Sequence, residues 1–402
     1  MHSSILVIGA GFGGLWSALA AMRLLDQHQR LDLSVTVLAP QAELRVRPRF
    51  YEHELAPTVA PLGELFETVG INFVQGSASA IDGQAKRVSY TAAGGTQQLL
   101  TYDRLIIASG SQVARPSSVS GIGEYTFDVD SYTSAARLNE HLHALAELPA
   151  TAQRNTVVVV GGGFTGIETA TEMPARLRAI LGEDAAVRVV IVDRGQAMGA
   201  SMGQAIGEVV AQASEAVGVT WRLGATVQAV DASGVWLADG EHIAASTVVW
   251  AVGVKASPLT GQVTGERDLN GRLHVDASLK VLGQDAIFAA GDTAFAASDD
   301  LGNHALMTCQ HAIALGRSAG NNAAADLLGV PPTPYSQVKY VTCLDLGAWG
   351  AVYTEGWERK VLLTGAEGKA LKTQINTQWI YPPAAHRESA LAAADPLIPV
   401  VA

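Results

Sequence analysis

The chain has 402 residues, of which 48% are hydrophobic and only 16% charged, and it contains 41 glycines. This length allows two or three domains with their own cores, and the composition is typical of buried α/β proteins rather than of disordered chains. The net charge of −11 argues against nucleic acid as a partner, because binding phosphates needs a basic face.

The first predicted unit is a strand, a glycine-rich turn and a helix. The apolar run Ser4–Ile8 predicts a short parallel strand buried on both faces. It leads into GAGFGG, where Gly9, Gly11 and Gly14 form the pattern GxGxxG, and helix-forming residues continue over 15–26. In a dinucleotide-binding turn the first glycine permits the tight bend, the second lets the diphosphate approach, and the third lets helix and strand pack closely. This context favours a dinucleotide site over an ordinary glycine-rich turn.

The same pattern recurs one domain later. A second apolar run, Thr156–Val160, leads into GGGFTG, where Gly161, Gly163 and Gly166 take the three glycine positions. The two turns begin 152 residues apart, which is the spacing of repeated domains rather than of a solenoid. Two dinucleotide sites in one chain suggest a resident flavin and a visiting nicotinamide, with electrons passing between them.

The strand after the second turn ends in an acid. The run Val187–Val192 is followed by Asp193, and a carboxylate there suits a ribose 2′-hydroxyl and repels a 2′-phosphate. We therefore expect NAD(H) at the second site, with NADP(H) less favoured. The alternative is that Asp193 is an ordinary polar residue at a strand end.

Three further segments carry a family resemblance. They are YDRLIIASGS at 102–111, VVWAVG at 248–253 and IFAAGD at 287–292. Together with the two turns they make the sequence resemble the two-dinucleotide-fold flavoprotein reductases, and among these the type II NADH dehydrogenase-like group. The resemblance covers about residues 4–335.

The resemblance implies an α/β fold with two Rossmann-like domains. The FAD domain, residues 1–115 and 270–335, would be split by an inserted NAD(P)H domain, residues 116–269. A C-terminal α+β segment, residues 336–402, would cover the flavin and the acceptor side. The implied FAD contacts beyond the first turn are Arg47, Ser109, Gly110, Gly291 and Asp292, with Asp292 on the ribitol, and the implied further NAD contact is Gly253.

Two features of the FAD side stay open. The family usually has an acid near Ala39 for the FAD ribose, so this chain must make that contact in another way. Arg47 and Arg49 can neutralise the diphosphate or the reduced flavin, or they can simply be solvated.

The candidate catalytic residues are Glu168, Cys309 and Gln310. The resemblance places Glu168 near the junction of nicotinamide and flavin, although an early glutamate can also simply complement the helix dipole. The segment MTCQHAIAL resembles the AQxAxQQ signature that lines the quinone site of type II enzymes. Cys309 replaces the first alanine, Gln310 matches the first glutamine, and Ala314 and Leu315 replace the later glutamines. The alternative is a core helix in which the Gln310 amide is already satisfied.

Other chemistries are disfavoured. Disulfide reductases carry a cysteine pair soon after the first unit, and residues 30–70 contain no cysteine. A sulfide:quinone reductase would need Cys309 and Cys343, the only two cysteines, to meet in space. The ten histidines do not cluster at ligand spacing, so we expect no metal site.

The leading hypothesis is an FAD-dependent NADH dehydrogenase that passes hydride from NADH to the flavin and then reduces a quinone-like small molecule. The alternatives are a soluble reductase of the same family acting on a protein electron carrier or a specialised metabolite, and a slow NAD(H)-binding flavoprotein that senses redox state.

With no signal segment and no apolar run of about 18 residues, we expect a cytoplasmic protein without a transmembrane segment. The weak helix expected over 384–394 allows at most slight peripheral membrane contact. Flavoproteins of this kind often pair, so a homodimer is an open arrangement.

Overall fold

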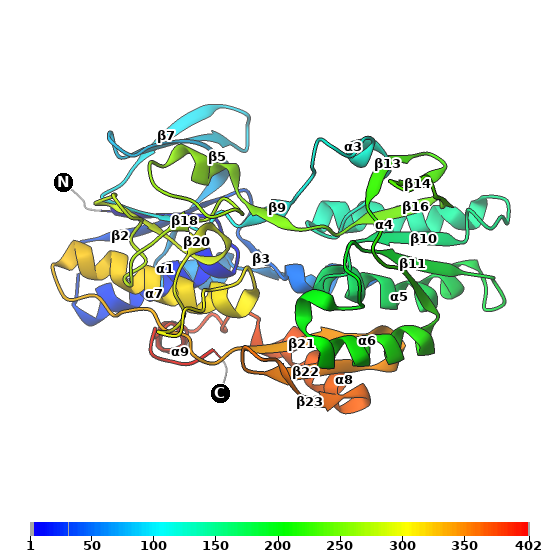
Figure 1. Ribbon diagram of the computed structural model, residues 1–402. Helices are drawn as coiled ribbons and strands as arrows, with labels where there is room; N and C mark the ends of the chain where they lie inside the picture. The colour runs from blue at the N-terminus through cyan, green and yellow to red at the C-terminus, as the bar shows by residue number, and fades with distance from the viewer. Residues whose placement is uncertain (1–3, 31, 401–402) are drawn as a thin grey trace.

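The computed structural model describes residues 4–30 and 32–400, and the two largest sheets of this part lie side by side (Figure 1). In the described chain the larger sheet has seven strands, in the order β19 (Ile287–Ala289), β8 (Arg104–Ile107), β1 (Ser4–Ile8), β2 (Ser34–Ala39), β5 (Asn72–Asp82), β6 (Arg87–Ala92) and β7 (Gln97–Thr101). The smaller sheet is ordered β12 (Val219–Arg222), β11 (Arg188–Val192), β10 (Thr156–Val160) and β16 (Thr247–Trp250). The predicted α/β class with two dinucleotide-binding sheets is confirmed.

Each glycine turn leaves the strand at which the order of its sheet reverses. Both neighbours of β1, namely β2 and β8, are parallel to it, and the same holds for β10 between β11 and β16. In such sheets ligands bind in the crevice outside the carboxyl ends of the strands at this switch point. The topology therefore puts both turns where a dinucleotide can be held.

Helices cover both sheets. The helices that accompany the larger sheet are α1 (Phe12–Gln27), α2 (Gly63–Val69), α7 (Cys309–Leu328) and α9 (Arg387–Ala393). One face of the smaller sheet shares a core with α4 (Tyr132–Ala144), α5 (Phe164–Leu181) and α6 (Gln204–Val217). Its other face packs on α3 (Ile122–Tyr125) and an antiparallel sheet of β13 (Val227–Asp231), β14 (Gly234–Leu237) and β15 (His242–Ala244). All five residues of β10 are buried, as expected for a strand covered on both faces.

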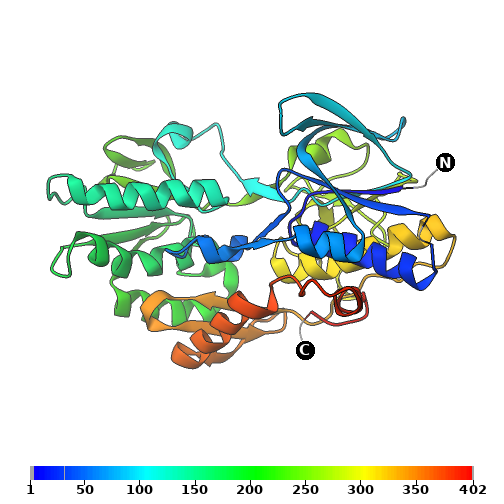
Figure 2. The same cartoon turned by 180° about the vertical axis from the view of Figure 1, so that it is seen from behind.

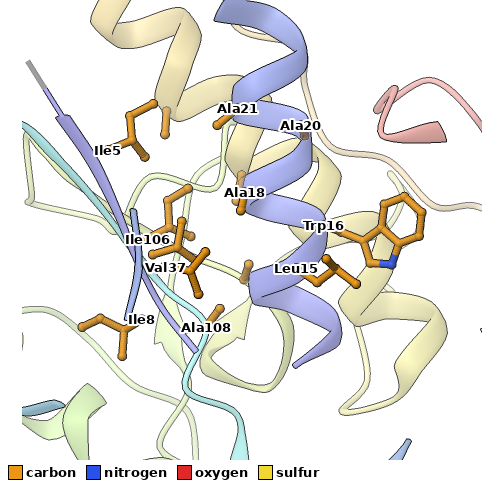
Figure 3. Close-up of a cluster of buried hydrophobic side chains, with 14 of the residues drawn as sticks. Ile5, Ile8, Leu15, Trp16, Ala18, Ala20, Ala21, Val37, Ile106 and Ala108 are labelled. Carbon is orange, nitrogen blue, oxygen red and sulfur yellow. The ribbon is translucent and has the colours of Figure 1, made fainter. Parts of the chain in front are cut away.

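Helices α1 and α7 touch almost backbone to backbone. A Cβ added at Gly316 would lie 2.6 Å from the Gly13 carbonyl oxygen, and one at Gly320 would lie 1.9 Å from the Ser17 carbonyl oxygen. On the side of α1 toward the strands, Figure 3 shows the small residue Ala18 beside Ile106. Only glycine allows this approach of two helices, so the start of α7 is held beside the first glycine turn.

The chain crosses between the two sheets on paired strands. β9 (Ser111–Val113) leaves the larger sheet, and β17 (Val254–Ala256) returns antiparallel to it. The side chain of Gln262 already contacts the backbone of Ser79 and Ile81 in β5, so the segment after β17 lies against the first sheet. The domain boundaries at residues 115/116, 269/270 and 335/336 stay predictions.

The C-terminal segment is α+β, as expected. It contains β21 (Val341–Asp345), β22 (Ala351–Glu355), β23 (Lys360–Thr364), α8 (Gly365–Gln374) and a π-helical turn (Ile375–Trp379) before α9. Its antiparallel sheet lies below α5 and α6, and α9 lies below α1 (Figures 1 and 2). The Arg49 guanidinium, which pairs with Glu52, also donates to the Tyr381 hydroxyl at 2.6 Å and joins this segment to the 3-10 turn at 47–49.

Short elements complete the fold. The remaining strands are β3 (Glu43–Arg45), β4 (Val59–Pro61), β18 (Leu273–His274) and β20 (Ala294–Phe295), and the 3-10 turns span Arg47–Arg49, Ala56–Thr58, Leu145–Glu147, Ala200–Met202, Pro258–Gln262, Gly291–Thr293 and Gly347–Trp349. Over residues 4–30 and 32–400, every helix is too short or too polar to cross a bilayer.

The contact between α1 and α7 gives a first prediction. We expect Gly320→Ala to lower the free energy of unfolding by about 1–3 kcal/mol, because the new methyl group overpacks against Ser17. Gly63→Ala in α2 is the matched control, since its Cβ would meet no described atom within 4 Å and its effect should be neutral to about 1 kcal/mol stabilising. Denaturant titration of both variants measures the difference. Equal stabilities would show that the two helices can separate freely.

Candidate dinucleotide and acceptor site

The two glycine turns have the same geometry. Gly9 has a φ of +109° and Gly161 a φ of +108°, a region that favours glycine. A Cβ at Gly14 would lie 1.9 Å from the Gly9 carbonyl oxygen, and a Cβ at Gly166 would lie at the same distance from that of Gly161. The first glycine of each turn therefore adopts a backbone conformation that would strain other residues. The third glycine lets the helix pack directly against the turn.

The middle glycine of each turn faces open space. A Cβ at Gly11 or at Gly163 would meet no described atom within 4 Å. These glycines are the N-caps of α1 and α5; within the described structure no side chain caps either helix, and neither first turn holds an acid. By contrast, the Thr308 hydroxyl caps α7 by accepting from the His311 N–H. Two helix starts with free N–H groups and open space beside them suit two diphosphates.

The residues expected around the first dinucleotide do come together. Asp292 accepts a hydrogen bond from Ser111 Oγ at 2.6 Å and lies 3.6 Å from Arg47 Nη1. Arg47 also pairs with Asp130, whose pKa is raised by burial although Arg47 opposes the shift. The buried hydroxyl of Ser109 has no partner in the described chain, which leaves a polar group free for a ligand.

Gly110 and Gly291 frame the same site. Gly110 has a φ of +69° and Gly291 a φ of +63°, and a Cβ at Gly13 in α1 would lie 3.3 Å from the Gly291 nitrogen. The glycine-aspartate segment therefore sits directly against the start of α1. The residues present fit an FAD diphosphate and ribitol, while Ala39 at the end of β2 offers no carboxylate to the ribose.

Asp193 is fixed by the second turn. Its carboxylate accepts from the Gly162 N–H and from the Gly195 N–H, each at 2.7 Å. Gly253, with a φ of +62°, follows β16 on the other side of the turn. An oriented carboxylate beside an uncapped helix fits a dinucleotide with a free 2′-hydroxyl, so the residues present fit NAD(H).

Glu168 forms a buried ion pair that the sequence did not predict. Its carboxylate lies 2.7 Å from Lys372 Nζ, and both side chains are 8% exposed. The Asp345 N–H also donates to Glu168, at 3.1 Å. Burial raises the pKa of Glu168 although Lys372 opposes the shift, and the Glu168 carboxylate outweighs burial to raise the pKa of Lys372. The pair thus retains protons more strongly than its free groups would.

A second charged group lies next to this pair. Lys369 Nζ contacts the carboxylates of Asp345 at 2.6 Å and of Glu172 at 3.5 Å, and Asp345 accepts from the Tyr51 hydroxyl at 2.9 Å. Asp345 and Glu172 outweigh burial and raise the pKa of Lys369. These contacts join α5, the C-terminal segment and the loop after β2 at one point.

Both thiols lie near enough to Lys372 for its charge to act on them. Both are free in the described chain, and burial raises the pKa of each to about 11 although Lys372 opposes the shift. Cys343 also has its backbone carbonyl 2.9 Å from Lys372 Nζ. A thiol with this pKa is protonated near neutrality and is a poor nucleophile, so the setting does not favour chemistry based on cysteine.

Gln310 is held by the backbone of β21. Its amide nitrogen donates to the Val341 carbonyl at 2.7 Å, and its amide oxygen accepts from the Val341 N–H at 3.4 Å. This is the satisfied amide that was the alternative at the sequence level. Ala314 is partly exposed and Leu315 fully buried, and a role of Gln310 toward an acceptor stays a prediction.

The sequence did not reveal several residues of this junction. Lys369 and Lys372 lie on a short polar helix that resembles a solvated surface, and Asp345 ends an ordinary strand. Asp345 and Lys372 both contact Glu168, which lies more than 150 residues earlier in the chain. Groups of three or more His, Cys, Asp or Glu placed to hold a metal ion do not occur among the described residues.

Two equivalent glycine turns, each following a strand with parallel neighbours on both sides, define an oxidoreductase with two dinucleotide-binding units. Over residues 3–316 the chain matches the family described as pyridine nucleotide-disulphide oxidoreductases, and it belongs to that family. Members of this family bind FAD and NAD(H).

Relatives and solved structures agree with this class. The chain is 46% identical over 402 residues to an NADH dehydrogenase-like protein of Mycobacterium tuberculosis, covering 98% of each chain. It is 31% identical to a demethylphylloquinone reductase of Synechocystis, covering 87% of this chain and 85% of that one. The fold is similar to that of NDH2 from Plasmodium falciparum, with a TM-score of 0.76 at 14% identity and 98% of each chain covered.

The buried ion pair gives the second prediction. We expect Lys372→Met to lower the free energy of unfolding by about 3–5 kcal/mol, because Glu168 is left buried without its cation. In this variant the folded state holds the Glu168 proton above the ordinary pKa of 4.5, so the deficit against the native protein should grow as pH rises from about 5 to 8. Denaturant titrations across this pH range measure it.

The double variant Glu168→Gln/Lys372→Met is the internal control. Its free energy of unfolding should return most of the way to the native value. The pH dependence seen in Lys372→Met should be absent, because the glutamine that replaces Glu168 carries no titrating proton. A single variant that is as stable as the native protein at pH 8 would show that Glu168 reaches water or another cation.

Proposed function

We propose that this chain is an FAD-dependent NADH dehydrogenase that delivers electrons to a quinone-like small molecule. The pair of equivalent, uncapped glycine turns supports this most directly, with the first turn assigned to FAD and the second to NAD(H). When bound, the flavin supplies hydride acceptance from NADH and electron release to the acceptor. Two relatives, a demethylphylloquinone reductase of Synechocystis and a type II NADH:quinone oxidoreductase of Staphylococcus saprophyticus, support the choice of acceptor.

The chain's own residues have separable tasks in this proposal. The starts of α1 and α5 hold the two diphosphates, and Asp193 selects a ribose with a free 2′-hydroxyl. The buried pair of Glu168 and Lys372 can hold a proton beside the site, since reduction of a quinone consumes protons. Cys309 and Gln310, at the start of α7, line the acceptor side.

The chief alternative is a reductase of the same family with another acceptor, such as a protein electron carrier or a specialised metabolite. The engagement of Gln310 with Val341 and the apolar residues Ala314 and Leu315 favour it, because few polar groups then remain on this helix for a quinone. A slow redox-sensing flavoprotein is the third candidate. The proposed setting is cytoplasmic, with at most weak membrane contact.

The assignment of the two turns can be tested separately. Gly11→Val should yield protein that purifies with little flavin, because the added methyl groups fill the open space for its diphosphate. Gly163→Val should keep its flavin but should no longer be reduced by NADH. Flavin absorbance of the purified proteins and anaerobic NADH titration measure both effects, and each variant is the control for the other. If Gly163→Val lost its flavin or Gly11→Val retained it, the assignment of FAD to the first turn and NAD(H) to the second would be contradicted.

The acceptor can be tested by rapid mixing. The FAD-loaded protein is reduced with NADH without oxygen and mixed with a soluble short-chain quinone while the flavin absorbance is followed. We expect complete reoxidation within one turnover, at a rate that rises with quinone concentration. Reduction by NADH followed by reoxidation no faster than with buffer alone would eliminate the quinone proposal and favour a protein carrier or another metabolite. Fast turnover with any acceptor would eliminate the sensor.

A further inference from the structure

The hairpin between β22 and β23 brings an arginine close to the second glycine turn. Arg359 Nη1 donates to the Ser201 carbonyl at 3.0 Å, and Ser201 belongs to the segment that follows β11. The Arg359 guanidinium also lies 5.9 Å from the centre of the Phe164 ring. Phe164 is the first residue of α5, directly after Gly163. A side chain from the C-terminal segment therefore reaches the helix start at which a diphosphate would bind.

Aromatic packing fixes the tip of this hairpin. Trp357 stacks on Tyr340 with ring centres 4.7 Å apart, and Tyr340 lies 5.4 Å from the buried ring of His311 in α7. The Arg359 guanidinium lies 5.9 Å from the Tyr340 ring as well. The arginine is thus held between α7 and the start of α5, and it does not sweep freely through solvent.

The charge of Arg359 is not neutralised by the protein. Four cations around this junction, Arg47, Arg49, Lys369 and Lys372, each form an ion pair with a carboxylate. Across residues 4–30 and 32–400, no carboxylate lies within ion-pair distance of Arg359, and its guanidinium donates to the neutral carbonyl of Ser201. In a chain of net charge −11, an unpaired and partly buried guanidinium beside an uncapped helix start marks the place for an anion.

We propose that Arg359 binds the diphosphate of NAD(H) from the C-terminal side and so completes the second dinucleotide site. Gly163 and the start of α5 would hold one side of the diphosphate, and the guanidinium of Arg359 the other. This inference rests on the assignment of the second turn to NAD(H). It makes the β22–β23 hairpin part of the nucleotide site, although that hairpin lies more than 150 residues away along the chain.

The backbone conformation at Arg359 allows a substitution that removes the side chain without straining the turn. Its φ is +52°, in the left-handed region that glycine adopts without strain, so Arg359→Gly removes the guanidinium and keeps the turn. Lys86→Gly is the matched control. Lys86 has a φ of +51° in the turn between β5 and β6, is exposed, and carries the same charge. Arg359→Lys keeps the charge but not the planar fork.

The test measures binding of ADP-ribose to the FAD-loaded, oxidised proteins by isothermal titration calorimetry. We expect Arg359→Gly to weaken binding about tenfold or more, as for loss of a charge-assisted hydrogen bond, and Lys86→Gly to change it by less than about twofold. Arg359→Lys should fall between the native protein and Arg359→Gly. The gap between native and Arg359→Gly should narrow at high salt.

The binding experiment tests the role of Arg359 separately from the proposed quinone acceptor. An affinity of Arg359→Gly within about twofold of native, or an equal loss in Lys86→Gly, would overturn the role of Arg359. ADP-ribose carries the diphosphate but takes no part in electron transfer, so this result does not depend on the acceptor. A native protein that binds ADP-ribose but fails to reduce a quinone would contradict the proposed acceptor and leave Arg359 in place.

Discussion

The arrangement depends on one constraint, the contact of backbones where no side chain fits. Gly14 meets Gly9 within the first turn, and Gly320 of α7 meets Ser17 of α1. Because each approach is closer than any Cβ allows, the strand, the turn and both helices hold one another in a fixed relation. The start of α7 therefore stands beside the first dinucleotide turn whatever residues it carries. Sequence change at Cys309, Gln310, Ala314 and Leu315 need not disturb this backbone contact, because the contact is made by Gly316 and Gly320 further along the helix.

The second constraint is charge buried where three parts of the chain meet. Lys372 and Lys369 reach from α8 to Glu168 and Glu172 on α5, and Asp345 joins both groups. Burying such charges is costly unless each is paired, so the network specifies one way to dock the C-terminal segment. The same lysines sit near two thiols that burial keeps protonated. The buried charges and the protonated thiols therefore lie together at this junction.

The sequence could predict what depends on local pattern. Both glycine turns, their strands and the acid at Asp193 were visible because a tight bend, an open approach and a strand end each demand a residue type at a fixed spacing. The partners of Glu168 and Gln310 were not visible. Lys372 lies on a helix with no distinctive pattern, and Val341 contributes only backbone, which no side chain signals. Arg359 was hidden for the same reason, since its neighbours Ser201 and Phe164 meet it only through the tertiary fold.

Electrostatics explain why such hidden contacts matter here. A chain of net charge −11 has no general attraction for an anionic dinucleotide, and charges beyond about 10 Å are screened at physiological salt. Attraction must then come from groups in direct contact. The starts of α1 and α5 offer it through N–H groups that, within the described structure, have no side-chain cap and no acid in the first turn. The cations Arg47, Arg49, Lys369 and Lys372 are each paired with a carboxylate. Under the proposed role of Arg359, the β22–β23 hairpin adds a direct ionic attraction to the second site that the local glycine turn does not contain. Docking of the C-terminal segment and binding of the nucleotide would then depend on each other.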